Sequence, residues 1–278
     1  MGWVRPLFAP PARHLIRLAT DPAYRAWRDL ERQLARAPRR SSRVVRALGM
    51  SLEVPDAASF LGSFHEIFVE QTLAFPPWGT PPRILDLGAN IGLSVLAFLR
   101  QHPDAVITAL EPDPVVARVL ERNVRENGGR RVQLLNRAAW SSSGALRFES
   151  DGADGGHLLP TATFEATPHG ANVIDVDAVD IATLFDEGAY DVIKMDIEGA
   201  EAVVLPALGE RLRRVRYLFV EYHGATGRPS TLATLIAPME AAGLTVHVHT
   251  VRARAHPFRP QSSTEPLEQI LHLYGVRR

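Results

Sequence analysis

The sequence feature that most constrains the fold lies at residues 83–94, RILDLGANIGLS. A short apolar run ends around Asp86, then passes through Gly88 and Gly92 into a second apolar segment. This order is typical of a buried parallel strand, a tight turn and the start of a helix, whose free amides favour an anionic or carboxylate-bearing ligand. The glycine spacing is G-x-x-x-G, whereas dinucleotide-binding turns have G-x-G-x-x-G. The stretch therefore favours S-adenosylmethionine over NAD as the ligand.

Composition limits the remaining classes of function. The chain has 278 residues, of which 46% are hydrophobic and 22% charged, and its formal net charge is zero. These values are ordinary for a soluble globular protein, and we expect no nucleic acid partner. The absence of cysteine excludes disulfides, thiolate zinc sites and cysteine nucleophiles. Of the 31 basic residues, 30 are arginine and one is Lys194, so the single lysine draws attention to its surroundings.

The first residues do not resemble a targeting segment. Arginine and proline interrupt residues 1–20, so the apolar core of a secretory signal is missing there. Nowhere does the sequence contain a run of about 18 apolar residues, the length that a membrane-spanning helix needs. We therefore expect a cytoplasmic protein with no transmembrane segment.

Two helices are predicted before residue 78. Apolar residues recur at helical spacing over 22–36, directly after Asp21, and again over 55–72. A cluster of prolines at 76–82 then interrupts the chain. We expect an N-terminal helical extension at 1–78 and a main domain at 79–278. A homo-oligomer formed through the extension is compatible with this division.

The main domain alternates between strand and helix patterns. This alternation predicts an α/β fold with a doubly wound, mostly parallel sheet. An antiparallel excursion is expected where 145–150 and 172–177 flank a glycine-rich loop at 152–156. The predicted strands are 83–88, 105–112, 131–139, 191–199, 216–223, 245–251 and 268–277, and the predicted helices are 93–102, 114–127, 180–187, 207–215 and 230–244.

Residues at the ends of the first three strands suit a nucleoside ligand. Glu111 ends the second strand, the position from which an acid accepts hydrogen bonds from ribose hydroxyls in doubly wound folds. The turn at 88–92 would hold the amino-acid end of the ligand, with Asp86 near its ammonium group. Asn136 and Ala138, at the end of the third strand, would lie near the adenine edge, because an Asn amide pairs with ring nitrogens and amines.

A second polar cluster follows strands four and five. The segment KMDIEGAE places Lys194, Asp196, Glu198 and Glu201 around a glycine turn. Glu221 and His223 are two residues apart on the next strand and so share a face. Such a group suits proton transfer or a hard metal such as Mg²⁺, and strand-end ion pairs with Lys194 are the plain alternative.

These motifs together resemble a known family. RILDLGANIGLS, ALEPDP, NRAAW, DVIKMDIEGAE and FVEYHG, in this order and spacing, are similar to the FkbM family of methyltransferases, over about residues 58–225. The resemblance implies the seven-stranded Rossmann-like fold of class I methyltransferases and S-adenosylmethionine-dependent O-methylation of a small molecule, a secondary metabolite or saccharide. It also implies that Asp86, Gly88, Asn90 and Gly92 hold the methionine part of the cofactor, that Glu111 holds the ribose and that Asn136 lies near the adenine. Asp196 and Glu198 would border the reacting methyl group.

We assign catalytic and acceptor roles to the remaining polar residues. His223 is the first candidate for the base that removes the acceptor proton, because the usual pKa of histidine lies near working pH, and Glu221 would tune it. His65, in the extension, is the rival base, and Lys194 would orient the acids or the acceptor oxygen. We expect the acceptor to contact residues of the extension and of the acidic cluster, namely His65, Glu66, Glu201 and Glu221.

Two other functions compete with methyl transfer. A nicotinamide-dependent oxidoreductase is disfavoured by the glycine spacing and by the lack of a Tyr-x-x-x-Lys pair, since the only lysine is Lys194. A non-catalytic, methyltransferase-like binding module is disfavoured by the intact first motif and by the clustered acids. Cofactor titration and turnover with candidate alcohols separate these alternatives.

Overall fold

The computed structural model of the chain describes residues 11–150, 156–158, 172–225, 229–253 and 267–278. The chain divides into two compact units, Met1–Thr72 and Leu73–Arg278. The division falls between Thr72 and Leu73, upstream of the 78/79 boundary that the proline cluster predicts.

The N-terminal unit contains the two predicted helices. Helix α2 (Pro22–Leu34) begins after Asp21, whose carboxylate accepts a hydrogen bond from the backbone amide of Tyr24. Helix α3 (Ala57–Phe64) continues into a π-helical turn, η1 (His65–Val69). A further helix, α1 (Pro11–Thr20), precedes them. The helical predictions over 22–36 and 55–72 are thus confirmed.

The N-terminal unit also holds a β-hairpin, which the two predicted helices did not include. Strand β1 (Arg43–Ala47) pairs antiparallel with β2 (Met50–Val54). Leu48 and Gly49 form the turn between them with φ angles of 51° and 78°, the left-handed pair that a two-residue hairpin turn requires. Alternate residues of β2 are buried, which is the pattern of a half-buried strand.

The C-terminal unit confirms the predicted fold class. Its main sheet has seven strands in the order β12-β13-β11-β10-β3-β4-β5. The five strands from β11 to β5 are parallel, and β13 pairs antiparallel with both β11 and β12. The strands are β3 (Arg83–Leu87), β4 (Val106–Leu110), β5 (Val132–Leu135), β10 (Val192–Met195), β11 (Tyr217–Ala225), β12 (Thr245–Ala253) and β13 (Leu267–Val276).

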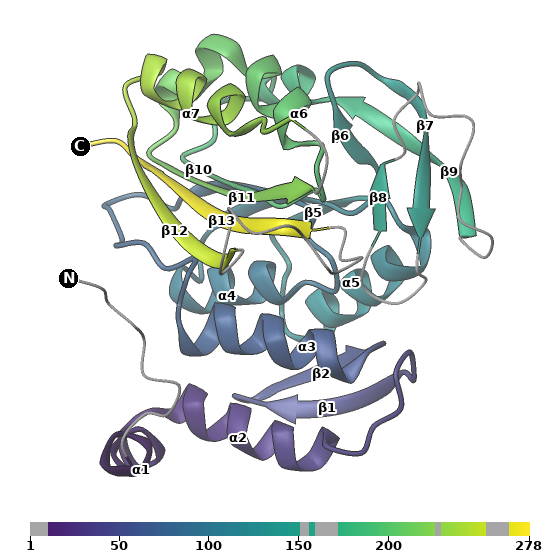
Figure 1. The fold of residues 1–278 in the computed structure, drawn as a ribbon, viewed down its shortest axis with the longest axis vertical. Coiled ribbons are helices and arrows are strands. Elements are labelled where there is room, and N and C mark those ends of the chain that lie inside the picture. Colours follow the sequence, from purple (N-terminus) through teal and green to yellow (C-terminus); the bar gives the residue numbers. More distant parts are fainter. Residues whose placement is uncertain (1–10, 151–155, 159–171, 226–228, 254–266) are drawn as a thin grey trace, which may run out of the picture. The chain divides into compact units, whose positions relative to one another are not determined.

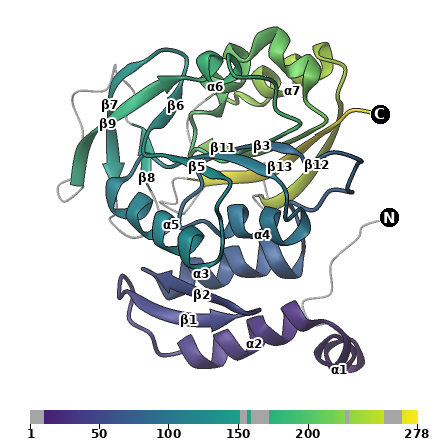
Figure 2. The ribbon, with the colours of Figure 1, turned by 180° about the vertical axis from the view of Figure 1, so that it is seen from behind.

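Helices cover both faces of this sheet (Figures 1 and 2). Helices α4 (Leu93–Gln101) and α5 (Pro114–Glu126) lie against one face, and α6 (Glu201–Ala207) and α7 (Leu232–Ala241) against the other. The central strands β3 and β10 are therefore nearly continuous runs of buried apolar residues, as parallel strands covered on both sides are. The carboxyl ends of the parallel strands meet at one edge, where ligands bind in folds of this kind.

A second, four-stranded sheet corrects one predicted strand. The prediction of a single strand over 131–139 was wrong: the segment divides into β5 and β6 (Ala138–Trp140), which belong to different sheets. Strand β9 (Asn172–Asp180) pairs parallel with β6 and antiparallel with β7 (Gly144–Ser150), which confirms the antiparallel excursion. The edge strand is β8 (Gly156–Leu158), and most of the predicted loop at 152–156 lies outside the described residues.

Short helical turns complete the unit. The predicted helices at 180–187 and 207–215 are 3₁₀ turns, η2 (Ile181–Phe185) and η3 (Gly209–Arg214). Within the described part of the chain, every helix is too short or too polar to span a bilayer.

Candidate functional site

The turn after β3 brings two strand ends into contact. The amides of Gly88 and Ala89 donate to the carbonyl of Leu110 at the end of β4, at 3.0 and 2.8 Å. Gly88 has φ 77°, and a Cβ there would lie 1.9 Å from the carbonyl oxygen of Asp196, after β10. Only glycine fits this crossing. The next glycine, Gly92, has φ 94° and begins α4.

A pocket opens beside this turn at the carboxyl ends of the strands. Its empty space, with the open mouth included, is about 650 Å³. Its walls come from the β3 turn, the end of β4, the start of α5, the second sheet and the segment after β10. They are formed by Gly88, Asn90, Leu110, Glu111, Pro112, Asp113, Val116, Arg137, Ala138, Ala139, Phe148, Asp196, Ile197 and Glu198.

Glu111 lies in the wall of this pocket with its carboxylate held by backbone. Its Oε2 accepts from the amide of Asn90 at 3.0 Å and its Oε1 from the amide of Asp113 at 2.9 Å. Burial raises the pKa of Glu111 to about 7, although the two amides oppose the shift. Each oxygen keeps a further lone pair, so this carboxylate can accept hydrogen bonds from a ligand's hydroxyl groups.

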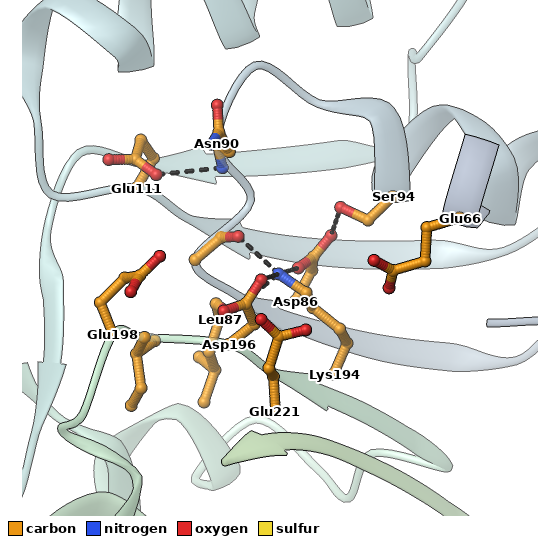
Figure 3. Close-up of polar contacts among 12 residues, drawn as sticks. Glu66, Asp86, Leu87, Asn90, Ser94, Glu111, Lys194, Asp196, Glu198 and Glu221 are labelled. Carbon is orange, nitrogen blue, oxygen red and sulfur yellow. Dashed lines mark hydrogen bonds and ion pairs between the residues drawn. The ribbon is translucent and has the colours of Figure 1, made fainter. Parts of the chain in front are cut away.

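Asp86 and Lys194 lie beneath the turn and not in the pocket wall (Figure 3). The ammonium of Lys194 donates to the carbonyl of Gly88 at 2.6 Å and lies 3.6 Å from Asp86 and 3.4 Å from Asp196. Burial would lower the pKa of Lys194, but Asp196 and Asp86 raise it above its usual value. Asp86 is fully buried and also accepts from the hydroxyl of Ser94. Lys194 therefore stays charged and ties the turn to β10.

Glu198 projects from the segment between β10 and α6. It has φ 54°, a left-handed conformation that is rare for a residue other than glycine, asparagine or aspartate. Its side chain is half-exposed and lines the pocket. Partial burial raises the pKa of Glu198 to about 7; His223 opposes the shift, whereas Asp196 and Glu221 add to it. Strained backbone of this kind is concentrated at functional sites.

His223 lies among three carboxylates instead of facing the pocket. Its Nε2 lies 3.1 Å from Glu221 and 3.5 Å from Glu198, and its Nδ1 lies 3.5 Å from Glu201. Burial would lower the pKa of His223, but contacts with Glu201 and Glu221 and the charge of Glu198 raise it to about 11. These contacts favour the protonated imidazole, whereas a base must be the neutral ring. The role of His223 as the base stays a prediction.

The acidic group does not fit a divalent metal. Asp196, Glu221 and His223 each offer an atom within 4.8 Å of the others. Lys194, however, already lies 3.4 Å from Asp196, and His223 Nε2 lies 3.1 Å from Glu221. To bind a metal, the imidazole of His223 would have to be neutral. The positive charge of this group is thus supplied by side chains.

Several residues predicted for the site have other contacts. Asn136 donates to the carbonyls of Glu111 and Pro112 at 2.8 and 2.9 Å, and it is outside the pocket wall. Glu201 is buried and accepts from the amide of Ile197 at 3.0 Å, and neither Glu201 nor Glu221 is part of the wall. The predicted contacts of Asn136 with adenine and of the two acids with an acceptor stay predictions.

Other wall residues escaped prediction. Arg137 and Phe148 line the pocket from the start of β6 and from β7. Asp113 caps α5, and the hydroxyl of Ser150 on β7 donates to its carboxylate. Arg137 lies within the NRAAW motif, which could have indicated it. Nothing local in the sequence of β7 indicates that Phe148 lines the pocket.

His65 and Glu66 belong to η1 in the N-terminal unit. The ring of His65 packs on Trp27 with centroids 4.4 Å apart. Burial lowers the pKa of His65, with Glu70 opposing the shift. The predicted contact of these two residues with an acceptor stays a prediction.

This fold, with a pocket at the carboxyl ends of its strands, is that of class I methyltransferases. A solved S-adenosylmethionine-dependent methyltransferase from Agrobacterium tumefaciens shares the fold, with a TM-score of 0.51 and 14% identity over 87% of this chain and 72% of its own. The model of the FkbM methyltransferase domain matches residues 86–249. The chain therefore belongs to the FkbM methyltransferase family.

Two characterised relatives agree with this membership. The methyltransferase sdnD of Sordaria araneosa is 30% identical over 203 residues, which cover 62% of this chain and 78% of the relative. The 2-O-methyltransferase NoeI of Sinorhizobium fredii is 29% identical over 157 residues, which cover 51% of this chain and 63% of the relative.

Proposed function

We propose that the chain is an S-adenosylmethionine-dependent O-methyltransferase that acts on a hydroxyl group of a small molecule. The observation that carries the proposal is the make-up of one pocket. Gly88, Asn90 and Glu111 form one part of its wall, and Asp196 and Glu198 form another. A methyl donor bound by the first part of the wall would lie next to a carboxylate of the second part.

The donor part suits a nucleoside that carries an amino acid. In this proposal Glu111 accepts hydrogen bonds from the ribose hydroxyls, while Gly88 and Asn90 border the methionine end. Ala138 and Arg137 border the base. Asp86 and Gly92 support the cofactor site indirectly. Asp86 contacts Lys194 and Ser94, and Gly92 permits the turn into α4.

The acceptor part suits removal of a proton from an alcohol. When bound, S-adenosylmethionine supplies an electrophilic methyl group on a positively charged sulfur. The acceptor oxygen forms a bond to that carbon as the carbon–sulfur bond breaks, and alignment of the two is the enzyme's main contribution. We assign the acceptor proton to the carboxylate of Glu198, whose pKa of about 7 matches general-base chemistry at neutral pH.

The name of NoeI, a 2-O-methyltransferase, supports oxygen as the atom that is methylated. A family relative of this kind makes a saccharide or another polyol a reasonable first class of acceptor to test. The family domain and the pocket-lining acids support an enzyme in preference to a binding module.

The test is methyl transfer from radiolabelled S-adenosylmethionine to a panel of simple methyl glycosides and polyols. We expect label in an acid-stable ether product and release of S-adenosylhomocysteine. Glu198→Gln should abolish most of the transfer but keep cofactor binding. Label in a nitrogen- or carbon-linked product, or cofactor binding with no transfer to any class of acceptor, would contradict the proposal.

A further inference from the structure

Glu221 and His272 form a buried contact across two strands. They are directly opposite each other in the antiparallel pairing of β11 with β13. Side chains at opposed positions project from the same face, and His272 Nε2 lies 2.7 Å from Glu221 Oε2. His272 is 2% exposed, so this contact is shielded from water. His272 lies beyond residues 86–249, the segment that the family model matches, whereas Glu221 lies within it.

The other oxygen of Glu221 holds a second imidazole. Glu221 Oε1 lies 3.1 Å from His223 Nε2, so one carboxylate joins two rings. Burial would raise the pKa of Glu221, but its contacts with His223 and His272 lower it to about 2. Glu221 is therefore an anion whose two oxygens are both committed, and its rotation would break one contact or the other.

The array reaches the pocket through His223. The same ring lies 3.5 Å from Glu198, which lines the pocket, and 3.5 Å from Glu201, on α6. Side chains from β13, β11 and α6 thus form a continuous chain of contacts behind Glu198, the carboxylate to which we assign the acceptor proton. His272 itself is absent from the pocket wall, so any effect on chemistry must pass through Glu221.

Packing alone does not account for His272. Its ring makes edge contacts with Phe219 and Tyr274, at centroid distances of 4.9 and 6.2 Å. A phenylalanine would make similar contacts without a buried polar nitrogen, which costs free energy unless it is hydrogen-bonded. In this structure the Nε2 of His272 contacts the carboxylate of Glu221, which also holds His223.

We propose that His272 is a positioning residue for methyl transfer: it fixes the carboxylate of Glu221, which holds the His223 imidazolium against Glu198. This inference rests on the proposed function, because it assumes that Glu198 accepts the acceptor proton. Strand β13, which lies outside the segment that the family model matches, then helps to place Glu198 through Glu221 and His223.

The kinetic test compares three variants of the full chain. His272→Phe keeps the ring packing and removes the donor, and His272→Gln restores a donor near the position of Nε2. The matched control is His249→Phe, on the neighbouring strand β12, where the side chain is exposed and opposite His272 in register. The assay uses the panel alcohol that wild type methylates fastest.

We expect His272→Phe to lower kcat about tenfold or more through misplacement of Glu198, with KM for S-adenosylmethionine unchanged. His272→Gln should recover part of kcat, and His249→Phe should match wild type. Wild-type kcat in His272→Phe, or equal losses in His272→Phe and His272→Gln, would overturn the inference.

A second readout does not depend on the acceptor. In long-range ¹H–¹⁵N spectra of the imidazole rings, we expect His272→Phe to move the His223 signals. Unmoved His223 signals would overturn the inference even if methyl transfer is confirmed. Moved signals together with a failure of methyl transfer would support the array and place the fault in the proposed function.

Discussion

The two parts of the pocket wall are built in different ways. The donor part comes from two consecutive strand-turn-helix units, and its central carboxylate, Glu111, is held by two backbone amides. The acceptor part comes from the segment between β10 and α6, and its carboxylates, Asp196 and Glu198, lie against the side chains of Lys194 on β10 and His223 on β11. Backbone amides follow from local chain path, whereas side-chain arrays depend on tertiary packing. The difference suggests that cofactor binding and proton removal can be separated by mutation.

The largest effect should come from Glu198→Gln. This variant removes the proton acceptor but keeps the side-chain size, so kcat should fall by about 10²–10³-fold, the range typical of a lost general base. The Kd for S-adenosylmethionine, measured by calorimetry, should stay within about twofold because Glu111 is intact. The matched control is Glu240→Gln, an exposed acid on α7. A weaker Kd with unchanged kcat would assign Glu198 to the donor part instead.

The converse variant is Glu111→Ala. Loss of the ribose acceptor should raise the Kd for S-adenosylmethionine by about 10–100-fold, the value of one or two hydrogen bonds to a charged group. At saturating cofactor, kcat should remain near that of wild type. Asp104→Asn, which alters an exposed acid paired with Arg131, provides the control. An unchanged Kd would remove Glu111 from cofactor binding.

The pH dependence should also distinguish the two parts. Glu198 must be ionised to accept a proton, and its pKa is about 7, so kcat at saturating cofactor should fall about tenfold per unit below pH 7 and level off above it. The groups that face Glu198 are His223, Asp196, Glu221 and Glu201. Because Glu111 also has a pKa of about 7, kcat/KM for the cofactor should fall more steeply than kcat. Identical profiles would mean that the two carboxylates do not act separately.

Metal removal should have the smallest effect. Lys194 and His223 already supply the positive charge beside Asp196 and Glu221, so activity in EDTA should stay within about twofold of the untreated rate. The same assay with added Mg²⁺ should show no gain. Loss of activity in EDTA with recovery in Mg²⁺ would show that these side chains bind a metal despite their contacts.

The parts of the fold that sequence predicts well are those fixed by local patterns. The 83–94 stretch predicted β3, its turn and α4, because apolar periodicity and two glycines leave few alternatives. The hairpin at Leu48 and Gly49 escaped, although its turn and the alternation in β2 are local signals. The split of 131–139 between β5 and β6 could not be read locally, because each half pairs with strands of a different sheet.

The site follows the same rule. Glu111, Gly88 and Glu198 were predicted because each ends a strand or forms a turn at the ligand edge. The protonated state of His223 was not, because it depends on carboxylates from three different elements. His272 was missed for a similar reason: it is 51 residues from Glu221 in sequence, and only the pairing of β11 with β13 brings them together.

The most direct test of the account is a calorimetric titration of the full chain with S-adenosylmethionine, and separately with NADH. The account predicts binding of S-adenosylmethionine at one site per chain, loss of affinity in Glu111→Ala, retention of affinity in Glu198→Gln, and no binding of NADH. Binding of NADH, or no binding of S-adenosylmethionine to the wild-type protein, would contradict it.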